Sequence, residues 1–413
     1  MSAGIEATDS EQRFPEWRRT LAAMVIVQAI MSLSFSFLTP VLPLFLPELG
    51  VEAEAQIYLW SGALAAITSF MAAIFSPLWG RIADRRGRKQ MVIRSTLAIG
   101  ICTFLMGFTQ DIWQMLGART LMGIFAGFSS GSVILISTQM PASRLNMALG
   151  LMSSAQLAGS LIGPVLGGGL ADLSGSYRLP FVVAGILALG ATLVCLVTVR
   201  EVFTAPAANA VRPGFAESAR RIWRRPELVA LVAVLMLTQF ATLAVQPVIA
   251  LYVQDIVGAQ TNLATLCGVA LSATGLAGIA AVPMLSRASD RFGEKRILIV
   301  ALAGAALATA PQALVGSYEA FVAERFCLGL FVGSIVPVAN ALIAKTTPTA
   351  ERGMVFGISS SAYFLGNSLG PATGGVVAAY AGLPWVFVVT TVLLIAGLAA
   401  VAMAVTDRPA ARA

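Results

Sequence analysis

Few side chains of this protein could do chemistry, and most of them are charged residues set between or inside long apolar runs. The segment Gly80 to Lys89 places Asp84 among five Arg and Lys residues, and a weaker copy surrounds Asp290, 206 residues later. We interpret both segments as loops between helices. A carboxylate in such a loop can pair with a guanidinium, such as that of Arg88, or with the positive N-terminus of a helix. The alternative is that the basic residues only fix the orientation of the chain in a membrane.

Three charged residues fall inside apolar runs: Arg119, Glu324 and Arg325. Charge within a bilayer is costly and is usually paired or functional. Glu324 and Arg325 are neighbours, so on a helix their side chains diverge by about 100°. Because the chain has no histidine, proton handling must use carboxylates, water or other groups. Glu324 is our first candidate and Asp84 the second, while an ion pair of Glu324 without proton cycling is the alternative.

The elements that must position these residues are membrane helices. The chain is 57% hydrophobic and 11% charged, where soluble domains carry roughly 25% charged residues. Runs of about 20 apolar residues are long enough to span a bilayer as helices. We expect an all-α protein with twelve spans at about 20–47, 57–80, 91–109, 112–138, 145–171, 180–199, 228–252, 262–286, 296–315, 319–344, 353–380 and 383–405.

The spans fall into two sets of six. We expect an N-terminal tail (1–19), a first half (20–199), a linker (200–227) rich in Ala, Pro and Arg, a second half (228–405) and a C-terminal tail (406–413). Of the 27 Lys and Arg residues, all but Arg119, Arg178 and Arg325 fall on the side of the two tails. The positive-inside rule therefore predicts a protein of the plasma (inner) membrane with both termini cytoplasmic. Basic residues in short loops fit this topology better than nucleic-acid binding.

The two halves repeat each other. Arg119 and Gly123 match Arg325 and Gly329, and the Gly-Pro run at Pro164 matches that at Pro371. These landmarks keep one order at an offset of 206 or 207 residues. Because six spans preserve direction, the halves are parallel repeats about an axis along the membrane normal. Small residues let membrane helices approach closely, and a spacing of four places them on one face. The residues of this packing motif are Gly159, Gly163, Pro164, Gly167, Gly168, Gly370 and Pro371.

These motifs resemble the major facilitator superfamily, and within it the twelve-span drug:proton antiporters. The segment Gly80 to Lys89 resembles the superfamily signature between helices 2 and 3, and Gly159 to Gly168 resembles the helix-5 signature of exporters. Trp60-Ser61-Gly62 and Leu42-Pro43-Leu44-Phe45 are similar to the MdtG-type multidrug resistance proteins. Many drug antiporters carry an acidic residue in helix 1, whereas this chain has none between Thr20 and Pro47.

The resemblance implies a latch from Asp84 to helix 11, with Asp290 as a degenerate counterpart. It implies that the glycine face of helix 5 packs on helix 8, and that helix 11 meets helix 2 near Pro371. It also implies a central cavity lined by helices 1, 4, 7 and 10. From its charge, Arg119 could bind anionic substrates or lower the pKa of a carboxylate by attraction. The polar and aromatic candidates in that cavity are Gln28, Ser34, Phe35, Gln239, Gln246 and Asn340. Each of them could instead be an interhelical hydrogen bond or a packing group.

We therefore expect an exporter of small amphiphilic compounds, driven by proton antiport through alternating access. Its partners would be the substrate, protons and membrane lipid, and it would work as a monomer. No pattern in the sequence predicts a cofactor, a metal site or enzymatic activity. An importer of a sugar or metabolite is the alternative, and a denser polar site would favour it. A membrane sensor or scaffold is a more remote one, because neither tail offers a signalling domain.

Overall fold

The computed structural model describes residues 16–201, 223–258, 260–348 and 351–405, and these residues are almost entirely helical. The helices before residue 202 are α2 (Trp17–Phe37), α3 (Val41–Phe45), η1 (Leu46–Leu49), α4 (Glu54–Arg86), α5 (Arg88–Met106), α6 (Ile112–Ile124), α7 (Phe128–Gln139), η2 (Ala142–Arg144), α8 (Leu145–Ser174) and α9 (Leu179–Thr198). Those after residue 222 are α11 (Pro226–Val245), η3 (Gln246–Val248), α12 (Ile249–Val257), α13 (Leu263–Phe292), α14 (Glu294–Thr309), η4 (Ala310–Leu314), α15 (Tyr318–Thr346), α16 (Arg352–Ala381) and α17 (Leu383–Ala404).

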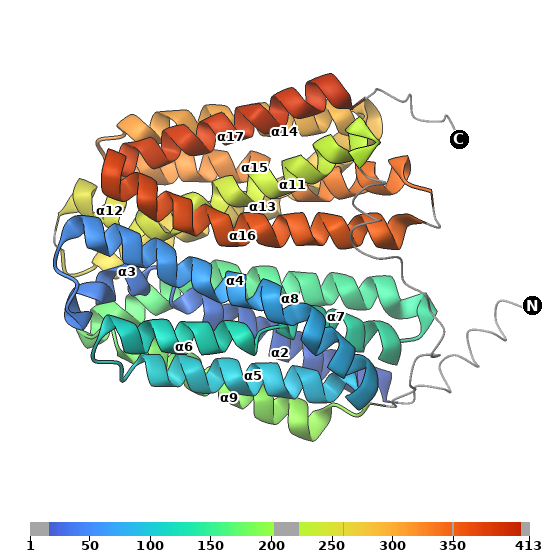
Figure 1. Cartoon of the computed structure of the whole chain (residues 1–413), viewed down its shortest axis with the longest axis horizontal. Helices are drawn as coiled ribbons and strands as arrows, with labels where there is room; N and C mark the ends of the chain where they lie inside the picture. Colours follow the sequence, from blue (N-terminus) through green and yellow to red (C-terminus); the bar gives the residue numbers. More distant parts are fainter. Residues whose placement is uncertain (1–15, 202–222, 259, 349–350, 406–413) are drawn as a thin grey trace, which may run out of the picture.

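The two groups of helices lie side by side along the long axis of the molecule, blue to green below and yellow to red above in Figure 1. We call the helices up to α9 the N-terminal half and those from α11 the C-terminal half. The bundle has two ends. The Asp172 end, on the left, is where α8 ends and α13 begins, and the Gly87 end, on the right, is where α4 ends and α5 begins.

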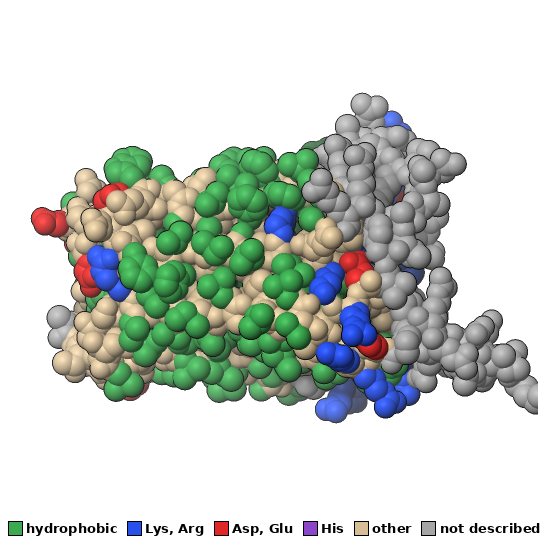
Figure 2. Space-filling model, turned by 90° about the horizontal axis from the view of Figure 1, so that it is seen from below, with side chains coloured by type: hydrophobic (Ala, Val, Ile, Leu, Met, Phe, Trp, Pro, Cys, Tyr) green, Lys and Arg blue, Asp and Glu red, His purple; other side chains and the backbone are tan. Residues whose placement is uncertain are grey.

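The length and composition of the helices fit a bilayer. Within the described residues, eleven helical segments are long and apolar enough to cross a membrane. The remaining long helix, α16, runs parallel to them in Figure 1 but is less apolar, because its 30 residues include several Gly and Ser residues and Asn367. Figure 2 shows a belt of hydrophobic side chains around the middle, with Lys and Arg gathered toward the Gly87 end. The fold is therefore a multi-pass membrane bundle, as the sequence predicts.

The buried apolar side chains show where the halves join. One cluster at the Asp172 end contains residues of both halves, among them Phe45 and Tyr58 from the first and Tyr252 and Phe387 from the second. Toward the Gly87 end there are two separate clusters. One, around Met24 and Leu135, belongs to the N-terminal half, and the other, around Leu298 and Ile343, belongs to the C-terminal half. Among the described residues, the halves thus share an apolar core at the Asp172 end and have separate cores toward the Gly87 end.

The structure corrects several expected boundaries. The segment from Gly80 to Arg86 continues α4 as a helix, and only Gly87, with φ of 95°, interrupts the chain before α5. The copy behaves alike, since α13 continues to Phe292 and Gly293 has φ of 88°. A φ in this region is easily adopted only by glycine. Of the expected linker, residues 202–222 lie outside the described part, and Pro226 already begins α11.

Three expected spans are also interrupted. The first breaks after Phe37, so that α3 and η1 follow α2 as short separate pieces. The seventh changes to a 3-10 turn at Gln246, one residue before Pro247, and continues as α12. The fourth breaks between α6 and α7, where Gly127 has φ of 123°.

Candidate functional site

The candidate site is the pair of contacts between the halves at the Asp172 end. In the first contact, the Asp172 carboxylate at the end of α8 reaches the first turn of α13. Its Oδ2 accepts hydrogen bonds from Thr265 N at 2.7 Å and Thr265 Oγ1 at 2.6 Å, and its Oδ1 accepts one from Ala264 N at 3.2 Å. The first N–H groups of a helix have no partner within it and carry its positive dipole end. Asp172 therefore caps a helix of the opposite half.

Below this cap the two helices approach to backbone contact. A Cβ added at Gly168 would lie 2.1 Å from Ala264 O, and one added at Gly268 would lie 2.2 Å from Pro164 O. Deeper along the same contact, Ser272 Oγ donates to Leu161 O at 2.6 Å. We call this contact, from Asp172 to Ser272, the α8–α13 seam. Any side chain at either glycine would separate the backbones, so the seam exists only because both are glycine.

The second contact joins α16 to α4. A Cβ added at Gly62 would lie 2.4 Å from Pro371 O, and one added at Gly375 would lie 2.5 Å from Tyr58 O. Pro371 thus contacts the second membrane span, which is α4, as the resemblance implies. This seam lacks the carboxylate cap of the other one, because Ala379 stands at the position that corresponds to Asp172 at an offset of 207 residues.

The glycine stripe of α8 has a different partner from the expected one. Added Cβ atoms at Gly159, Gly163 and Gly167 would lie 2.6 Å from Ala29 O, 2.7 Å from Ser36 Cβ and 2.0 Å from Phe37 O. All three residues belong to α2, within the N-terminal half. The prediction that this face packs on the eighth membrane span, which is α13, is therefore wrong.

Of the packing-motif residues on α8, Gly168 and Pro164, which lie on the adjacent face, are the ones that contact α13. The C-terminal half repeats the arrangement, since a Cβ at Gly370 would lie 2.6 Å from Phe240 O of α11. Each Gly-Pro helix therefore uses one face within its own half and another across the halves.

The charged segment lies at the Gly87 end, far along α4 from the seams. Asp84 and Asp290 fall in the last two turns of α4 and α13, but their side chains lie outside the described part of the structure. Glu201, which follows α9, is a contact residue that no motif in the sequence predicts. Its Oε1 accepts from Arg88 N and its Oε2 from Lys89 N, both at 2.8 Å, so it caps the N-terminus of α5.

The charges inside the helices are buried as expected. Arg119 of α6 and Arg325 of α15 are 7% and 6% exposed, and the Nε atom of each has no hydrogen-bond partner among the described residues. Glu324 is half-buried, and its Oε2 is likewise without a partner there. No ion pair joins Glu324 to Arg325 in the described part, which agrees with the divergence of adjacent helical side chains.

Two of the expected cavity residues form a duplicated pair of amide hydrogen bonds. Gln28 Nε2 of α2 donates to Gln156 Oε1 of α8 at 3.2 Å, and Gln239 Nε2 of α11 donates to Asn367 Oδ1 of α16 at 2.8 Å. Both pairs join residues 128 apart and link corresponding helices of the two halves, but at an offset of 211 residues the second pair lies about one turn further along than the repeat offset of 207 would place it. Gln28 and Gln239 therefore hold helices together, which was the alternative to ligand contact.

The other expected cavity residues are scattered in environment. Ser34 is buried, Phe35 is exposed, and Gln246 and Asn340 are half-buried. The structure does not bring these four together into one described pocket. Their assignment to a substrate cavity stays a prediction.

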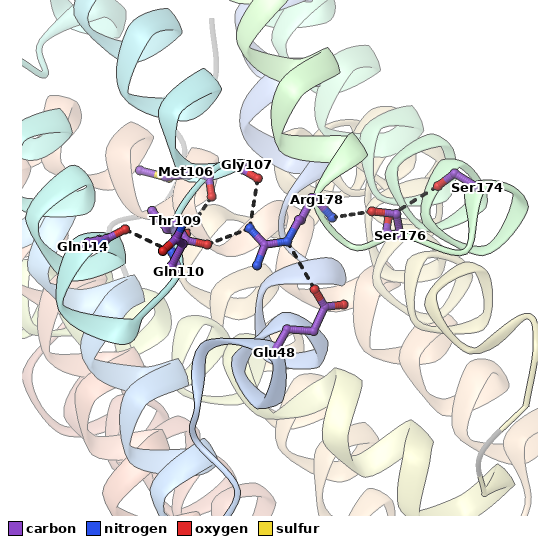
Figure 3. Close-up of polar contacts among 9 residues, drawn as sticks. All are labelled: Glu48, Met106, Gly107, Thr109, Gln110, Gln114, Ser174, Ser176 and Arg178. Carbon is purple, nitrogen blue, oxygen red and sulfur yellow. Dashed lines mark hydrogen bonds and ion pairs between the residues drawn. The ribbon is translucent and has the colours of Figure 1, made fainter.

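Arg178 at the Asp172 end organises the connecting segments of the N-terminal half (Figure 3). Its Nη1 donates to Thr109 O at 2.7 Å and to Gly107 O at 3.3 Å, while its Nε lies 3.5 Å from Glu48 Oε2. The side chain thus ties the α8–α9 connection to η1 and to the α5–α6 connection. This explains structurally why a single basic residue lies at this end.

A second arginine, Arg94 of α5, fixes the break in the fourth span. Its guanidinium lies 3.5 Å above the Trp79 ring and donates to Phe125 O and Ala126 O at 3.3 and 3.1 Å. Trp79 Nε1 donates to Ile124 O at 2.7 Å. The carbonyls freed at the end of α6 are therefore satisfied by side chains of α4 and α5.

Comparison with known proteins agrees with this architecture. The Major Facilitator Superfamily profile matches residues 24–270 and 258–413. The multidrug resistance protein MdtG of Serratia proteamaculans (strain 568) is 35% identical over 383 residues, which cover 92% of each chain. MdtG of Proteus mirabilis (strain HI4320) is 34% identical over 378 residues, 92% of this chain and 94% of that protein.

Solved structures share the fold at low sequence identity. A bacterial homologue of the human lysosomal transporter Spinster, in an inward-facing and occupied conformation, aligns with a TM-score of 0.76 at 18% identity and covers 94% of this chain and 97% of that one. The nucleoside transporter NupG (D323A mutant) aligns with a TM-score of 0.74 at 14% identity, over 94% of this chain and 100% of that one. With the duplicated halves, their seams and these matches taken together, the chain belongs to the Major Facilitator Superfamily.

Proposed function

We propose that this protein exports small amphiphilic compounds from the cell, as a proton-coupled antiporter that works by alternating access. The main support is the identity of about one residue in three, over more than nine-tenths of the chain, with proteins named for multidrug resistance. The shared core at one end and the separate cores at the other support a cycle in which the halves rock against each other.

The orientation follows from charge. Lys and Arg gather toward the Gly87 end, and the positive-inside rule assigns such an end to the cytoplasm of a bacterial inner membrane. Both termini are then cytoplasmic, and the Asp172 end faces outward. In this orientation the described conformation is closed to the outside, where the two seams meet.

The site residues take the following roles in this proposal. Glu324 carries the proton, because it is a carboxylate placed inside a span with a buried oxygen that has no partner among the described residues. Asp84 is the second candidate, and with Arg88 it latches the cytoplasmic side when that side is shut. Arg119 and Arg325 hold fixed positive charge within the two halves, and Asp290 serves the weaker copy of the latch. The protein works as a monomer.

Transport into everted membrane vesicles tests the function directly. Inward acidification should drive accumulation of fluorescent amphiphilic cations, and a protonophore should abolish it. Vesicles that contain a known antiporter serve as the positive control. If the control accumulates the compounds while this protein moves none of a broad panel in a pH-dependent way, the proposed function is wrong.

A further inference from the structure

The C-terminal half contains a small enclosed cavity away from the seams. It has a volume of about 20 Å³ and lies among α11, α13, α14, α15, α17 and η4. Its wall combines apolar groups with six polar side chains: Thr242, Thr274, Thr309, Gln312, Arg325 and Thr390. A water-sized particle needs roughly 10–15 Å³ by the same measure, so this cavity fits one such particle and excludes drug-sized or polyatomic ligands.

Three buried polar atoms that line this cavity have no hydrogen-bond partner among the described residues. They are Arg325 Nε, Thr274 Oγ1 and Gln312 Oε1. Arg325 is 6% exposed and Gln312 is fully buried. Buried polar groups are nearly always paired, so their convergence on one enclosed space indicates that something polar occupies it.

The charge of Arg325 decides what that occupant is. Within the described part of the structure, the guanidinium has no carboxylate at ion-pair distance. A buried charge without a partner is strongly unfavourable, and an arginine keeps its proton in proteins. A water molecule would satisfy hydrogen bonds and leave the charge uncompensated, whereas a cation would be repelled. A single small anion offsets the charge and also accepts hydrogen bonds.

The hydroxyl groups around the cavity suit an anion. Thr274 has a free hydroxyl donor, and Thr390 makes only a long hydrogen bond of 3.4 Å to Ala241 O. Gln312 Nε2 donates to Ala308 O at 2.8 Å, so its Oε1 can accept a hydrogen bond from the guanidinium and does not bind the anion. We propose that this cavity binds one monovalent anion of the size of chloride, held by Arg325 and Thr274.

The N-terminal half provides an internal comparison. Arg119 stands at the position of Arg325, but Met106 takes the place of Gln312 at the same offset of 206 residues. The corresponding threonine, Thr68, uses its hydroxyl to donate to Arg119 O at 3.2 Å. Thr103 takes the place of Thr309, so part of the polar wall is repeated, but the N-terminal half lacks the glutamine and the free threonine hydroxyl. Arg119 is therefore a matched control.

Chloride binding can be measured on the full chain in lipid nanodiscs, without any transport assay. After exchange into sodium gluconate, sodium chloride is titrated at constant ionic strength, and thermal unfolding and chloride-35 NMR line width are followed. We expect a saturable rise of the unfolding midpoint and a matching line broadening. Thr274→Val, which keeps the side-chain volume, should weaken binding about tenfold because it removes one hydrogen bond to a charged ligand. Arg325→Gln should abolish it.

Two variants keep the test specific. Thr238 on α11 also has a buried hydroxyl without a partner in the described part, but it does not line the cavity, so Thr238→Val should leave the chloride response unchanged. Arg119→Gln should do the same. If the unfolding midpoint is the same in sodium chloride and in sodium gluconate, water fills the cavity. A chloride response that survives in Thr274→Val and Arg325→Gln would place the ion elsewhere. Either result overturns the proposal.

Discussion

Asp172 joins the two halves, because its carboxylate accepts hydrogen bonds from the backbone of the opposite half. Hydrogen bonds to a charged group contribute about 1.5–3 kcal/mol, and this carboxylate accepts three of them from α13. If the seam opens during transport, all three are exchanged for water. Asp172 therefore biases the protein toward the conformation that is closed at its end of the bundle.

Asp172→Ala should shift the equilibrium toward the open seam by about tenfold or more, because a factor of ten corresponds to about 1.4 kcal/mol. The measurement is the rate at which an impermeant maleimide, added from the Asp172 side, modifies a cysteine at Ser272 in a background without the native cysteines. Asp111→Ala is a matched control, since Asp111 caps α6 within its own half through Trp113 N and Gln114 N at 2.9 Å. Equal labelling rates in both variants would show that Asp172 does not hold the seam.

Glu324→Gln tests the coupling residue. A glutamine side chain neither gains nor loses a proton, so pH-driven accumulation should fall to background. Binding of the compound to purified protein should persist. Asp84→Asn should retain proton coupling and transport more slowly, because it loses only the latch. If Glu324→Gln couples normally and Asp84→Asn does not, the two assignments must be exchanged. If both couple normally, the proton is carried elsewhere.

At this scale the sequence predicted which charges would be buried but not their partners. Arg119, Glu324 and Arg325 lie inside helices, as the apolar flanks require. Contacts such as that of Glu201 with Lys89, which are 112 residues apart, depend on the way that α9 packs beside α5. No local sequence pattern predicts such contacts.

The helices α8 and α16 each carry small residues on two faces, one that packs within its own half and one that packs against the other half. On α8 the stripe of Gly159, Gly163 and Gly167 faces α2, and Gly168 faces α13. A spacing of four residues shows that a face exists, but it does not say which helix lies opposite. The sequence therefore predicts the packing motif but not the helix that it contacts. The helical ends were misplaced for a related reason, since α4 stops at the glycine with positive φ and not where the apolar run stops.

Gly168→Ala should prevent the closed seam, because its Cβ would lie 2.1 Å from Ala264 O. Gly169→Ala is the control beside it, since its nearest neighbour, Thr265 Oγ1, would be 3.9 Å away. We expect the first variant to fold, to expose the Ser272 cysteine and to lose transport, and the second to behave as the parent protein. The comparison uses the labelling assay together with the unfolding midpoint. A Gly168→Ala protein with a closed seam and normal transport would contradict the packing described.

The whole molecule consists of two copies of one helical unit, and their described residues share a continuous apolar core at the Asp172 end. The repeated landmarks predicted the two halves and their parallel arrangement, because duplication leaves the same order of residues at a constant offset. They could not predict which end is closed, since both conformations of a rocking pair use the same sequence. The closed end is identified by the backbone contacts at the two seams and by the apolar core that the halves share there.

Paired spin-label distances at both ends of the bundle test the central claim, which is that the halves open at one end as they close at the other. Labels at Leu173 and Gln260 report on the Asp172 end, and labels at Met147 and Met284 report on the Gly87 end, all at exposed positions. In nanodiscs, as pH is changed or a transported compound is added, we predict that the first distance lengthens while the second shortens, with equal changes in population. If the two distances lengthen together, or stay fixed in protein that transports, the account is wrong.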